Sequence, residues 1–576
     1  MRLNPRSFSD DLQIAIRQHV QTRMESMRGY RLAWWTHWMA LAEMFLPRRY
    51  RYFITANNYS RGSPMNQAIV DETGLLAARV LATGLLSGLT SPTKPWFALQ
   101  LAGADIADEG PAQRWLAECT RRMLEVYAGS NFYQMLGQAY WDMVVFGSAA
   151  LFQFEDADTV VHFANPPLGE FLFGLNAKLE VDTLGHEFTY TVKEAVDLFG
   201  LENVSVGTRT AYTNGGSNWD TEIVVCCMTE PNTDIYLGGV SQGKLLPAKF
   251  SYRKVWWEQT SQGGQKGYFL NRVEGFNEKP FNGLRWDVTS NDAYGRSPGM
   301  DALPAVRQLQ IEQRRKAEAI DKMVRPPMVA SVSMKNEPMD ILPGGVSYVA
   351  DPAGSGFKPA FTVEPRISEM MEDLKEVQGR VQRVFFNDLF LGISQLGTVR
   401  TATEIEARQQ ETLVQIGPVI ERTEAELDAL VERTFAIMLR RKLFPPPPPE
   451  IQGAPLTVRY ISMFAETQRA AATTAMERLV ATVGGMTGIN PAIWDNIDTD
   501  KFTDIYANQL NVPPEVMRSL KEIAVIRQAR SQQEQAAAAL QTGQVAAQSA
   551  QTLSQTDVGG GQNALQLMLG NGAPQQ

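Results

Sequence analysis

The sequence predicts an α+β protein that is mainly helical and contains more than one domain. The chain has 576 residues, more than a single hydrophobic core usually serves. Helical periodicity covers long stretches toward both ends of the chain. Between about 148 and 290, short β-branched and alternating runs are separated by Gly, Pro and Asn, which is typical of antiparallel strands. Helical regions flanking an antiparallel sheet are the pattern of the α+β class.

The first part of the chain is expected to be helical. Apolar residues recur at helical spacing in three segments, the first of which ends at Pro47: 8–46, 66–90 and 111–147. The apolar run 69–90 contains Asp71 and Arg79, so we expect a buried helix there and not a membrane span. In the strand-rich region that follows, TVKEAVDLFGL at 191–201 predicts one interrupting helix.

The last part of the chain is expected to return to helix. Two long helices surround a Pro- and Gly-rich module at 326–365, which has strand and turn signals. The longest helix, at about 401–442, contains Gly417-Pro418, which should kink it. Prolines 445–449 predict a stiff polyproline spacer, and helices then resume to about 530. The Gln/Ala/Gly-rich tail from 531 predicts disorder, with transient helix at its start.

Composition limits the functional classes. The formal net charge is −9, whereas a protein that grips nucleic acid tightly is usually basic. Three cysteines, two of them adjacent at Cys226-Cys227, do not form a disulfide framework. Adjacent residues in a strand point to opposite faces, so this pair is not expected to share a zinc ion.

No convincing enzyme or metal motif is found in the sequence. GGVSQGKL at 238–245 matches a phosphate-binding loop only in part, because Leu245 replaces the Ser or Thr that would hold magnesium. Since it lies between two strand-like runs, a hairpin turn is the better interpretation. The four histidines lack a partner at metal-ligand spacing: His19, His37, His162 and His186. We therefore expect no enzyme activity, no cofactor and no metal.

The two long helices carry complementary apolar seams. Residues of the second helix recur at spacings of three and four, as in a heptad: Ile367, Met370, Leu374, Val377, Val381 and Val384. The first helix offers a similar stripe through Leu303, Val306, Leu309, Gln313, Ala317, Ile320 and Val324. The helices could pair antiparallel over about 40 Å at about 1.5 Å per residue. Whether another subunit or the third long helix covers the pair stays open.

The remaining faces of these helices carry charges of both signs. The cations are Arg307, Arg314, Arg315, Lys316, Lys322 and Arg325 on the first helix, and Lys375, Arg380 and Arg383 on the second. Such faces are usually only solvated. If they lined a pore, mixed charge would have a purpose. Duplex DNA carries one negative charge per about 1.7 Å, and a uniformly basic wall would hold it in place, whereas a wall of mixed charge lets it slide.

At this point the sequence resembles a known family, the portal or head-to-tail connector proteins of short-tailed bacteriophages. The resemblance spans roughly 10–530. It is carried by the order of several segments around the two helices: RLAWWTHWMALAEMFLP, IVDETGLLAARVLATGLLSGLTSPTKPWFAL, RWDVTSNDAYGRSPGMDALPAVRQLQ and RTATEIEARQQETLVQIGPVIERTEAELDALVERTFAIMLRR.

The resemblance implies a portal fold assembled as a ring, usually of about twelve subunits. It implies this division: wing 1–297, stem helix 298–325, clip 326–365, stem helix 366–390, tunnel loop 391–400, long kinked wing helix and return strand 401–470, helical crown 471–530, and tail 531–576, either disordered or an extended helical barrel as in some proteins of the family. The tunnel loop would present Gly392, Gly397 and Arg400 to the channel. The kink at Gly417-Pro418 falls where the family bends its long helix.

The implied function is passage of double-stranded DNA through one capsid vertex during packaging and ejection. The implied partners are other copies of the chain, DNA that is not read by sequence, the large terminase subunit, tail adaptors, and the major capsid and scaffolding proteins, with no membrane. The implied location is the virion, with host cytoplasm during assembly. The alternatives are a helical adaptor or ejection protein, which would show amphipathic helices with a strongly basic face, and an enzyme.

Overall fold

The computed structural model describes residues 2–54, 62, 65–101, 110–237, 240–259, 270–325, 328–329, 358–359, 366–391, 402–449, 456–461, 476–485, 497–509 and 520–555. Two compact units are distinguished. The first contains Met1–Ala98, Thr120–Phe444 and Val458–Val480, and the second contains Leu99–Cys119, Pro445–Thr457 and Ala481–Gln576.

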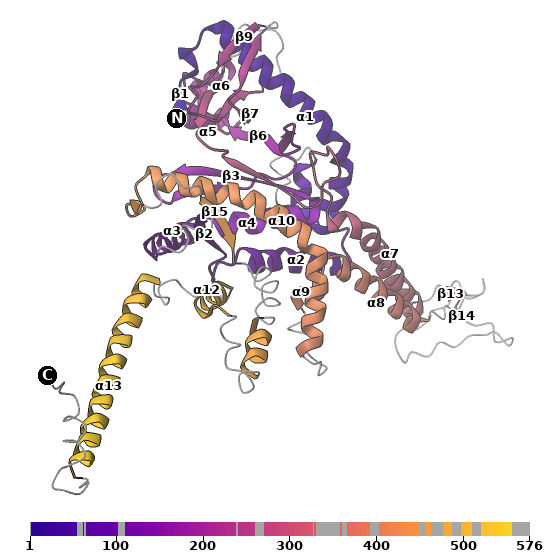
Figure 1. Cartoon of the computed structure of the whole chain (residues 1–576). Helices are drawn as coiled ribbons and strands as arrows, with labels where there is room; N and C mark the ends of the chain where they lie inside the picture. Colours follow the sequence, from indigo (N-terminus) through magenta and orange to yellow (C-terminus); the bar gives the residue numbers. More distant parts are fainter. Residues whose placement is uncertain are drawn as a thin grey trace, which may run out of the picture. The chain divides into compact units, whose positions relative to one another are not determined.

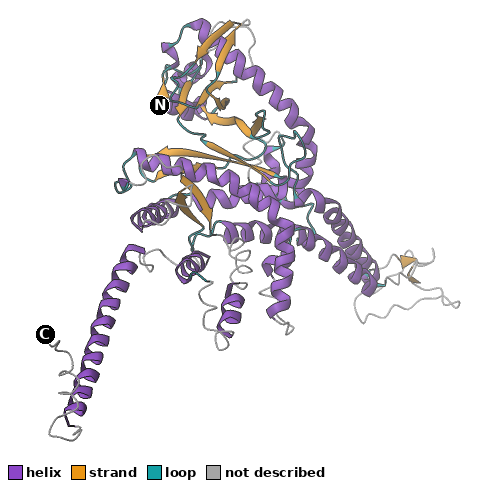
Figure 2. Ribbon diagram, viewed as in Figure 1, coloured by secondary structure: helices purple, strands orange, loops and turns teal. Residues whose placement is uncertain are grey.

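Helices dominate the chain, with strands concentrated in its middle (Figures 1 and 2). The α-helices are α1 Asp10–Phe45, α2 Thr73–Leu89, α3 Gly110–Gly129, α4 Phe132–Phe146, α5 Val192–Phe199, α6 Val206–Asn214, α7 Pro298–Val324, α8 Ile367–Val384, α9 Asn387–Leu391, α10 Ala402–Arg440, α12 Thr499–Gln509 and α13 Leu520–Gln555. Short 3₁₀ helices are η1 Pro5–Ser7, η2 Pro47–Tyr52 and η5 Gly216–Asp220. The expected class, mainly helical α+β, is confirmed. Among the described residues, no helix is both long enough and apolar enough to cross a bilayer.

The largest sheet has six strands in the order β1-β11-β10-β7-β6-β5, each pair antiparallel. A second sheet has the order β12-β3-β4, and three further pairs are β13-β14, β15-β2 and β8-β9. The strands are β1 Arg2–Leu3, β2 Phe97–Leu101, β3 Ser148–Asp156, β4 Val160–Ala164, β5 Phe171–Leu175, β6 Val181–Thr191, β7 Glu222–Pro231, β8 Asp234–Leu237, β9 Val240–Lys244, β10 Tyr252–Glu258, β11 Arg272–Phe276, β12 Phe281–Arg285, β13 Met328–Val329, β14 Lys358–Pro359 and β15 Leu456–Tyr460.

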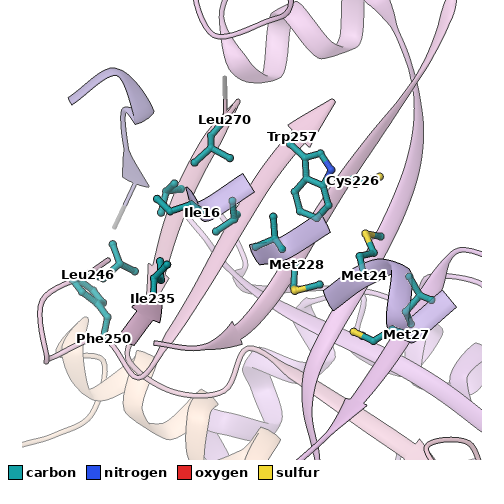
Figure 3. Close-up of a cluster of buried hydrophobic side chains, with 14 residues drawn as sticks. Ile16, Met24, Met27, Cys226, Met228, Ile235, Leu246, Phe250, Trp257 and Leu270 are labelled. Atoms are coloured by element: carbon teal, nitrogen blue, oxygen red, sulfur yellow. The ribbon is translucent and has the colours of Figure 1, made fainter. Parts of the chain in front are cut away.

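Successive side chains of β7 point to opposite faces of the large sheet and join a hydrophobic core on each face. Cys226 and Met228 join a cluster with Met24 of α1 and Trp257 of β10, which Figure 3 shows in close-up. Cys227 faces the other way, into a cluster with α5. The expectation that the two cysteines point to opposite faces is confirmed. Burial raises the pKa of Cys226 to about 12 and that of Cys227 to about 11, so both thiols stay protonated.

Two sequence predictions about helices need correction. Segment 111–147 is two helices, because Asn131 leaves the helical path to bind Phe163 of β4. Its Nδ2 donates to the Phe163 carbonyl at 2.8 Å, and its Oδ1 accepts from the Phe163 amide at 2.9 Å. Helix α6 was not predicted. The tail was expected to be either disordered or an extended helical barrel; α13 continues through its first part to Gln555, in keeping with the high helix propensity of its Ala- and Gln-rich sequence.

Candidate functional site

Helix α7 starts where glycines allow close contact between backbones: Gly295 and Gly299 lie against the end of α4 at Val145 and Gly147. We call this place the joint. Ser297 caps the helix by accepting from the Met300 amide at 3.1 Å, and its hydroxyl donates to the Val145 carbonyl at 2.6 Å. Gly147 ends α4 with φ +83° and lies directly against the Gly295 backbone. A Cβ on Gly299 would lie 2.7 Å from the Val145 carbonyl oxygen. The direction in which α7 leaves the body is therefore set by backbone contacts with α4.

The second predicted long helix is shorter than expected. Helix α8 ends at Val384, and Phe386 takes a left-handed φ of +52° before α9 begins. This break turns Phe385 into the core, where its ring contacts Phe45 of α1 with centroids 5.6 Å apart. It also lets the Phe390 ring of α9 lie directly on Gly84 of α2. A Cβ on residue 84 would overlap that ring, so only glycine fits at this position. The prediction that the helix runs to about 390 was wrong because burial of these phenylalanines overrides helix continuation.

Helices α7 and α8 pack side by side and form an arm (Figure 1), a term used below for these two helices. The half of the arm near the body has a buried seam made of Leu303, Val306, Leu309, Leu374, Val377 and Val381. Helices α1, α2 and α4 pack against α7, and α2 packs against α8. Met370 and Val384 are half-buried, while the side chain of Ile367 lies outside the described set. Cover for the inner seam therefore comes from α1, α2 and α4 of the same chain.

The outer half of the arm exposes apolar side chains. Val324 is 71% exposed and Ile311 51%. Met323, Met371 and Ile320 are also exposed, and so is Ala317 of the expected stripe. Apolar surface gathered on one projecting element usually marks an interaction site.

A polar cluster fastens the arm to the segment before α2. We call it the arm lock: Asp71, Gln310, Gln313 and Gln378. The Gln310 side chain accepts from the Val70 amide at 2.6 Å and the Asp71 amide at 2.8 Å, and it donates to the Asp71 carbonyl at 2.9 Å. The Asp71 carboxylate accepts from Gln313 at 3.0 Å and Gln378 at 2.9 Å. Both arm helices are thus tied to one carboxylate.

We expect Gln310→Ala to destabilise the protein by about 1–3 kcal/mol, because it leaves three backbone groups around Asp71 unpaired in a buried place. Gln308→Ala is the control, since Gln308 bonds only to Glu312 and Arg380 on a partly exposed face. Urea unfolding followed by tryptophan fluorescence measures both. Equal losses for the two variants would contradict a special role for the lock.

The arm lock also predicts a pH dependence. Burial raises the pKa of Asp71, but hydrogen bonds from Thr73, Gln313 and Gln378 outweigh it and lower the pKa below its ordinary 3.8. A lowered pKa contributes stability above that value, and the contribution is lost as pH falls through the folded pKa. Asp71→Asn should therefore flatten the loss of stability below about pH 4.

The cations singled out in the sequence lie on the outside of the arm. Arg307, Arg314, Arg315 and Lys322 are exposed, and at about 100° per residue they occupy a sector of about 100°, whose centre lies about 130° around the helix from that of the buried seam. Arg380 and Arg383 of α8 are exposed as well. Arg380 donates to Gln308 at 3.2 Å, and Arg314 to the Ala68 carbonyl at 3.2 Å.

Opposite charges balance along the arm. Helix α7 has five cationic and four acidic side chains, and α8 has three cationic and four acidic, so their formal charges cancel. Within α8, Arg380 and Arg383 lie toward the body and Glu369, Glu372 and Asp373 mark the outer end, whereas the cations of α7 continue to Lys322 near its outer end. A surface of this kind can touch phosphates but offers no net attraction to hold them.

Several predicted site residues lie outside the described part of the chain. Gly392, Gly397 and Arg400 are among them. Of the module at 326–365, Met328–Val329 and Lys358–Pro359 are described, and they pair antiparallel. Helix α10 continues through Pro418, next to the half-buried Gly417, and changes direction along its length in Figure 1. A kink at Gly417-Pro418 stays a prediction.

The motifs judged unconvincing in the sequence are structural. The GGVSQGKL segment contributes β9, which pairs antiparallel with β8 in a hairpin with Leu237 opposite Val240, as expected. His19 lies beside Glu230, and His186 beside Glu170. Within the described ranges, no cluster of His, Cys, Asp and Glu could hold a metal ion.

The arrangement of segments along the chain matches a family model. Residues 17–517 match that of the bacteriophage head to tail connecting protein. The chain belongs to this family. The match covers most of the region, roughly 10–530, in which the sequence resembled portal proteins, including both helices of the arm. The resemblance stated from the sequence is confirmed.

Two connector relatives are similar over nearly their full length. The portal protein of Salmonella phage epsilon15 is 35% identical over 564 residues, which are 97% of this chain and 99% of the relative. The probable portal protein of Bordetella phage BPP-1 is 37% identical over 531 residues, covering 90% of this chain and 92% of the relative. Among solved structures, the neck of an empty gene transfer agent particle matches with a TM-score of 0.35 and 13% identity, covering 72% of this chain and 86% of that one.

Sequence reasoning missed the residues that hold the connector arm in place. Gln313 was named in the predicted apolar stripe, where a polar side chain was the available signal, but its role was not recognised and the buried Gln310 was passed over. Asp71 was noticed only as a charge in an apolar run. The partnership of Asp71 with Gln310 could not be read from the sequence, because the two residues are 239 positions apart.

Proposed function

We propose that this chain is the subunit of a portal ring at one vertex of a phage capsid, through which double-stranded DNA is packaged and later ejected. The observation that carries the proposal is the family match over 17–517, together with portal-named relatives at 35–37% identity. The portal role is the one that these relatives are named for. It makes the protein a component of the virion at the connection between head and tail.

The exposed outer half of the arm supports ring assembly. A surface with Val324, Met323 and Met371 exposed is expected to be covered when the arm of a neighbouring subunit packs beside it. A head-to-tail interface repeated around an axis closes into a ring. We propose about twelve subunits, the number usual in this family.

The charge pattern supports a channel wall formed by the arm. Exposed cations at Arg307, Arg314, Arg315, Lys322, Arg380 and Arg383 would touch phosphates in passing, together with Arg400 of the tunnel loop. Since the charges of the two helices cancel, DNA would slide without being held. The contacts would be to the backbone and would carry no sequence information.

The division of the chain proposed here follows the family. The body and its sheets would be the wing (1–297), α7 and α8 the stem (298–325 and 366–390), 326–365 the clip, 391–400 the tunnel loop, 401–470 the long kinked wing helix and return strand, 471–530 the crown, and 531–576 the tail. The last boundary falls inside α13, so a division before Leu520 fits the helix better.

The clip would dock the large terminase subunit during packaging and the tail adaptors afterwards. The wing would meet the major capsid and scaffolding proteins while the particle assembles in the host cytoplasm. We propose that the chain itself is not an enzyme and that a separate motor hydrolyses ATP. The hairpin formed by β8 and β9, in place of a phosphate-binding loop, supports this division of labour.

Electron microscopy of the purified full-length protein tests ring assembly. We expect top views with rotational symmetry and a central hole at least about 20 Å wide, enough for a DNA duplex. Monomers or dimers under all conditions would contradict the proposal and favour a tail adaptor or ejection protein.

Neutralising the wall tests the channel. We expect Arg307→Gln with Arg314→Gln to leave rings intact but to change the rate of DNA packaging or the retention of packaged DNA several-fold, with an effect that depends on salt. Lys193→Gln on α5 is the control, as an exposed cation of the sheet region. Normal packaging and retention at several salt concentrations would overturn the assignment of the arm as the wall.

A further inference from the structure

An arginine-rich cleft lies on the first unit, and its described lining includes none of the exposed cations of the arm. Its volume is about 1270 Å³, and its walls come from η2, α2 and α4. Four arginines line it: Arg48, Arg49, Arg51 and Arg79. Among the described lining residues, Asp142 is the only carboxylate. In a chain with a net charge of −9, such a concentration of positive charge is a local exception.

Three of the arginines are held in position by their neighbours. Arg49 donates to Asp142 at 3.1 Å, and that carboxylate is 1% exposed. The Arg51 guanidinium lies 4.5 Å from the centre of the Tyr52 ring, and that of Arg79 lies 5.5 Å from the Trp141 ring. Arg48 is exposed at the same cleft. Guanidinium groups fixed in this way lose little conformational freedom when a ligand binds.

We propose that this cleft binds an acidic peptide segment of another protein chain. Guanidinium groups recognise carboxylates through paired hydrogen bonds. Within the protein itself, Arg49 already binds the Asp142 carboxylate through one hydrogen bond. Peptide amides would find further partners in the side chains of Asn66, Gln134 and Gln138, which also line the cleft.

Two features favour a peptide over a nucleic acid. Single strands bind by stacking their bases on aromatic rings. Here cations already lie over Tyr52 and Trp141. The second feature is the set of side-chain amides that line the cleft, those of Asn66, Gln134 and Gln138, whose oxygens accept hydrogen bonds. The N–H groups of a peptide backbone can donate to these oxygens, whereas a phosphodiester backbone offers only acceptors.

The inference goes beyond the proposed channel and does not depend on it. The channel proposal rests on the arm, while the cleft is built by η2, α2 and α4. A ring that lacked peptide binding, or peptide binding without ring formation, would separate the two proposals.

Fluorescence anisotropy with the full-length protein tests the cleft. The probe is a labelled peptide of about ten alternating Glu and Ala residues, about 33 Å long when extended. The comparison probes are the same peptide with Gln in place of Glu, labelled single-stranded DNA and labelled duplex DNA. Measurements at about 0.1 M salt, where the Debye length is about 10 Å, and at about 1 M salt separate close pairing from long-range attraction.

We expect the Glu peptide to bind and the Gln peptide to bind at least about tenfold more weakly, since each charge-assisted hydrogen bond lost is worth about that factor. Arg48→Gln with Arg79→Gln should weaken binding of the Glu peptide by a similar factor, with an unchanged thermal midpoint. Arg48→Glu alone alters only an exposed side chain, and it should also weaken binding of the Glu peptide. Lys193→Gln should leave binding unchanged.

Three results would overturn the proposal. One is equal affinity for the Glu and Gln peptides. Another is full binding by the Arg48→Gln, Arg79→Gln protein or by Arg48→Glu. The third is binding of either DNA, but not of the Glu peptide, in a manner lost in these variants, which would make the cleft a nucleic-acid site.

Discussion

Gly147→Ala should be among the most destabilising single changes in this protein. A Cβ at this position would run into the backbone of Gly295, and the residue has φ +83°. A left-handed alanine costs about 1–2 kcal/mol, and forced overpacking typically about 1–3 kcal/mol more. Because α7 starts three residues after Gly295 at the same joint, the loss should also reduce assembly. Urea unfolding and the yield of assembled protein measure the two effects.

Gly243→Ala separates backbone strain from the clash. Gly243 has φ +80°, close to that of Gly147, but nothing lies within 4 Å of its would-be Cβ. We expect a loss of about 1–2 kcal/mol there. If both alanine variants lost the same amount, the contact between Gly147 and Gly295 would have no special importance.

Glu230→Gln should be the second large effect. Glu230 is 4% exposed and accepts from Arg253 Nε at 2.9 Å and Nη2 at 2.7 Å, and Arg253 is itself 1% exposed. Removing one member of a buried pair leaves the other charge uncompensated, at a cost of about 3–5 kcal/mol. The pair Arg121–Glu125 on the surface of α3 is the control, and Glu125→Gln should change stability by less than about 0.5 kcal/mol.

The same residue predicts how stability changes with pH. Burial raises the pKa of Glu230, but hydrogen bonds and charge from His19 and Arg253 outweigh it and lower the pKa below its ordinary 4.5. The stability contributed is fully present above that value and is lost as pH falls through the folded pKa. Between about pH 6 and 3, the free energy of unfolding should fall less steeply with decreasing pH in Glu230→Gln than in the unchanged protein. A parallel fall would contradict this reading.

Local patterns predicted the elements that matter for function. Apolar spacing of three and four, bounded by Ser297-Pro298 and Arg325-Pro326, gave α7 almost to the residue. Alternation along β7 placed Cys226 and Cys227 on opposite faces, and flanking strand signals predicted the β8–β9 hairpin. These features depend on neighbours in the sequence, which is why they could be read from it.

Contacts between side chains far apart in the sequence, which override the local helix or strand pattern, could not be predicted. Asn131 breaks a helix to bind β4, and Phe386 ends α8 so that Phe385 can reach the core. The cleft depends on the same kind of meeting, because Arg49 and Asp142 are 93 positions apart.

The sequence by itself determined the family, the helical arm and its balanced charge, because each follows from residue order and periodicity. Only the tertiary structure decided which half of the arm is buried, how Asp71 and Gln310 hold it, and where four arginines gather. Those outcomes depend on packing and on hydrogen bonds between segments far apart in the chain, where the free energy of burial outweighs local preference.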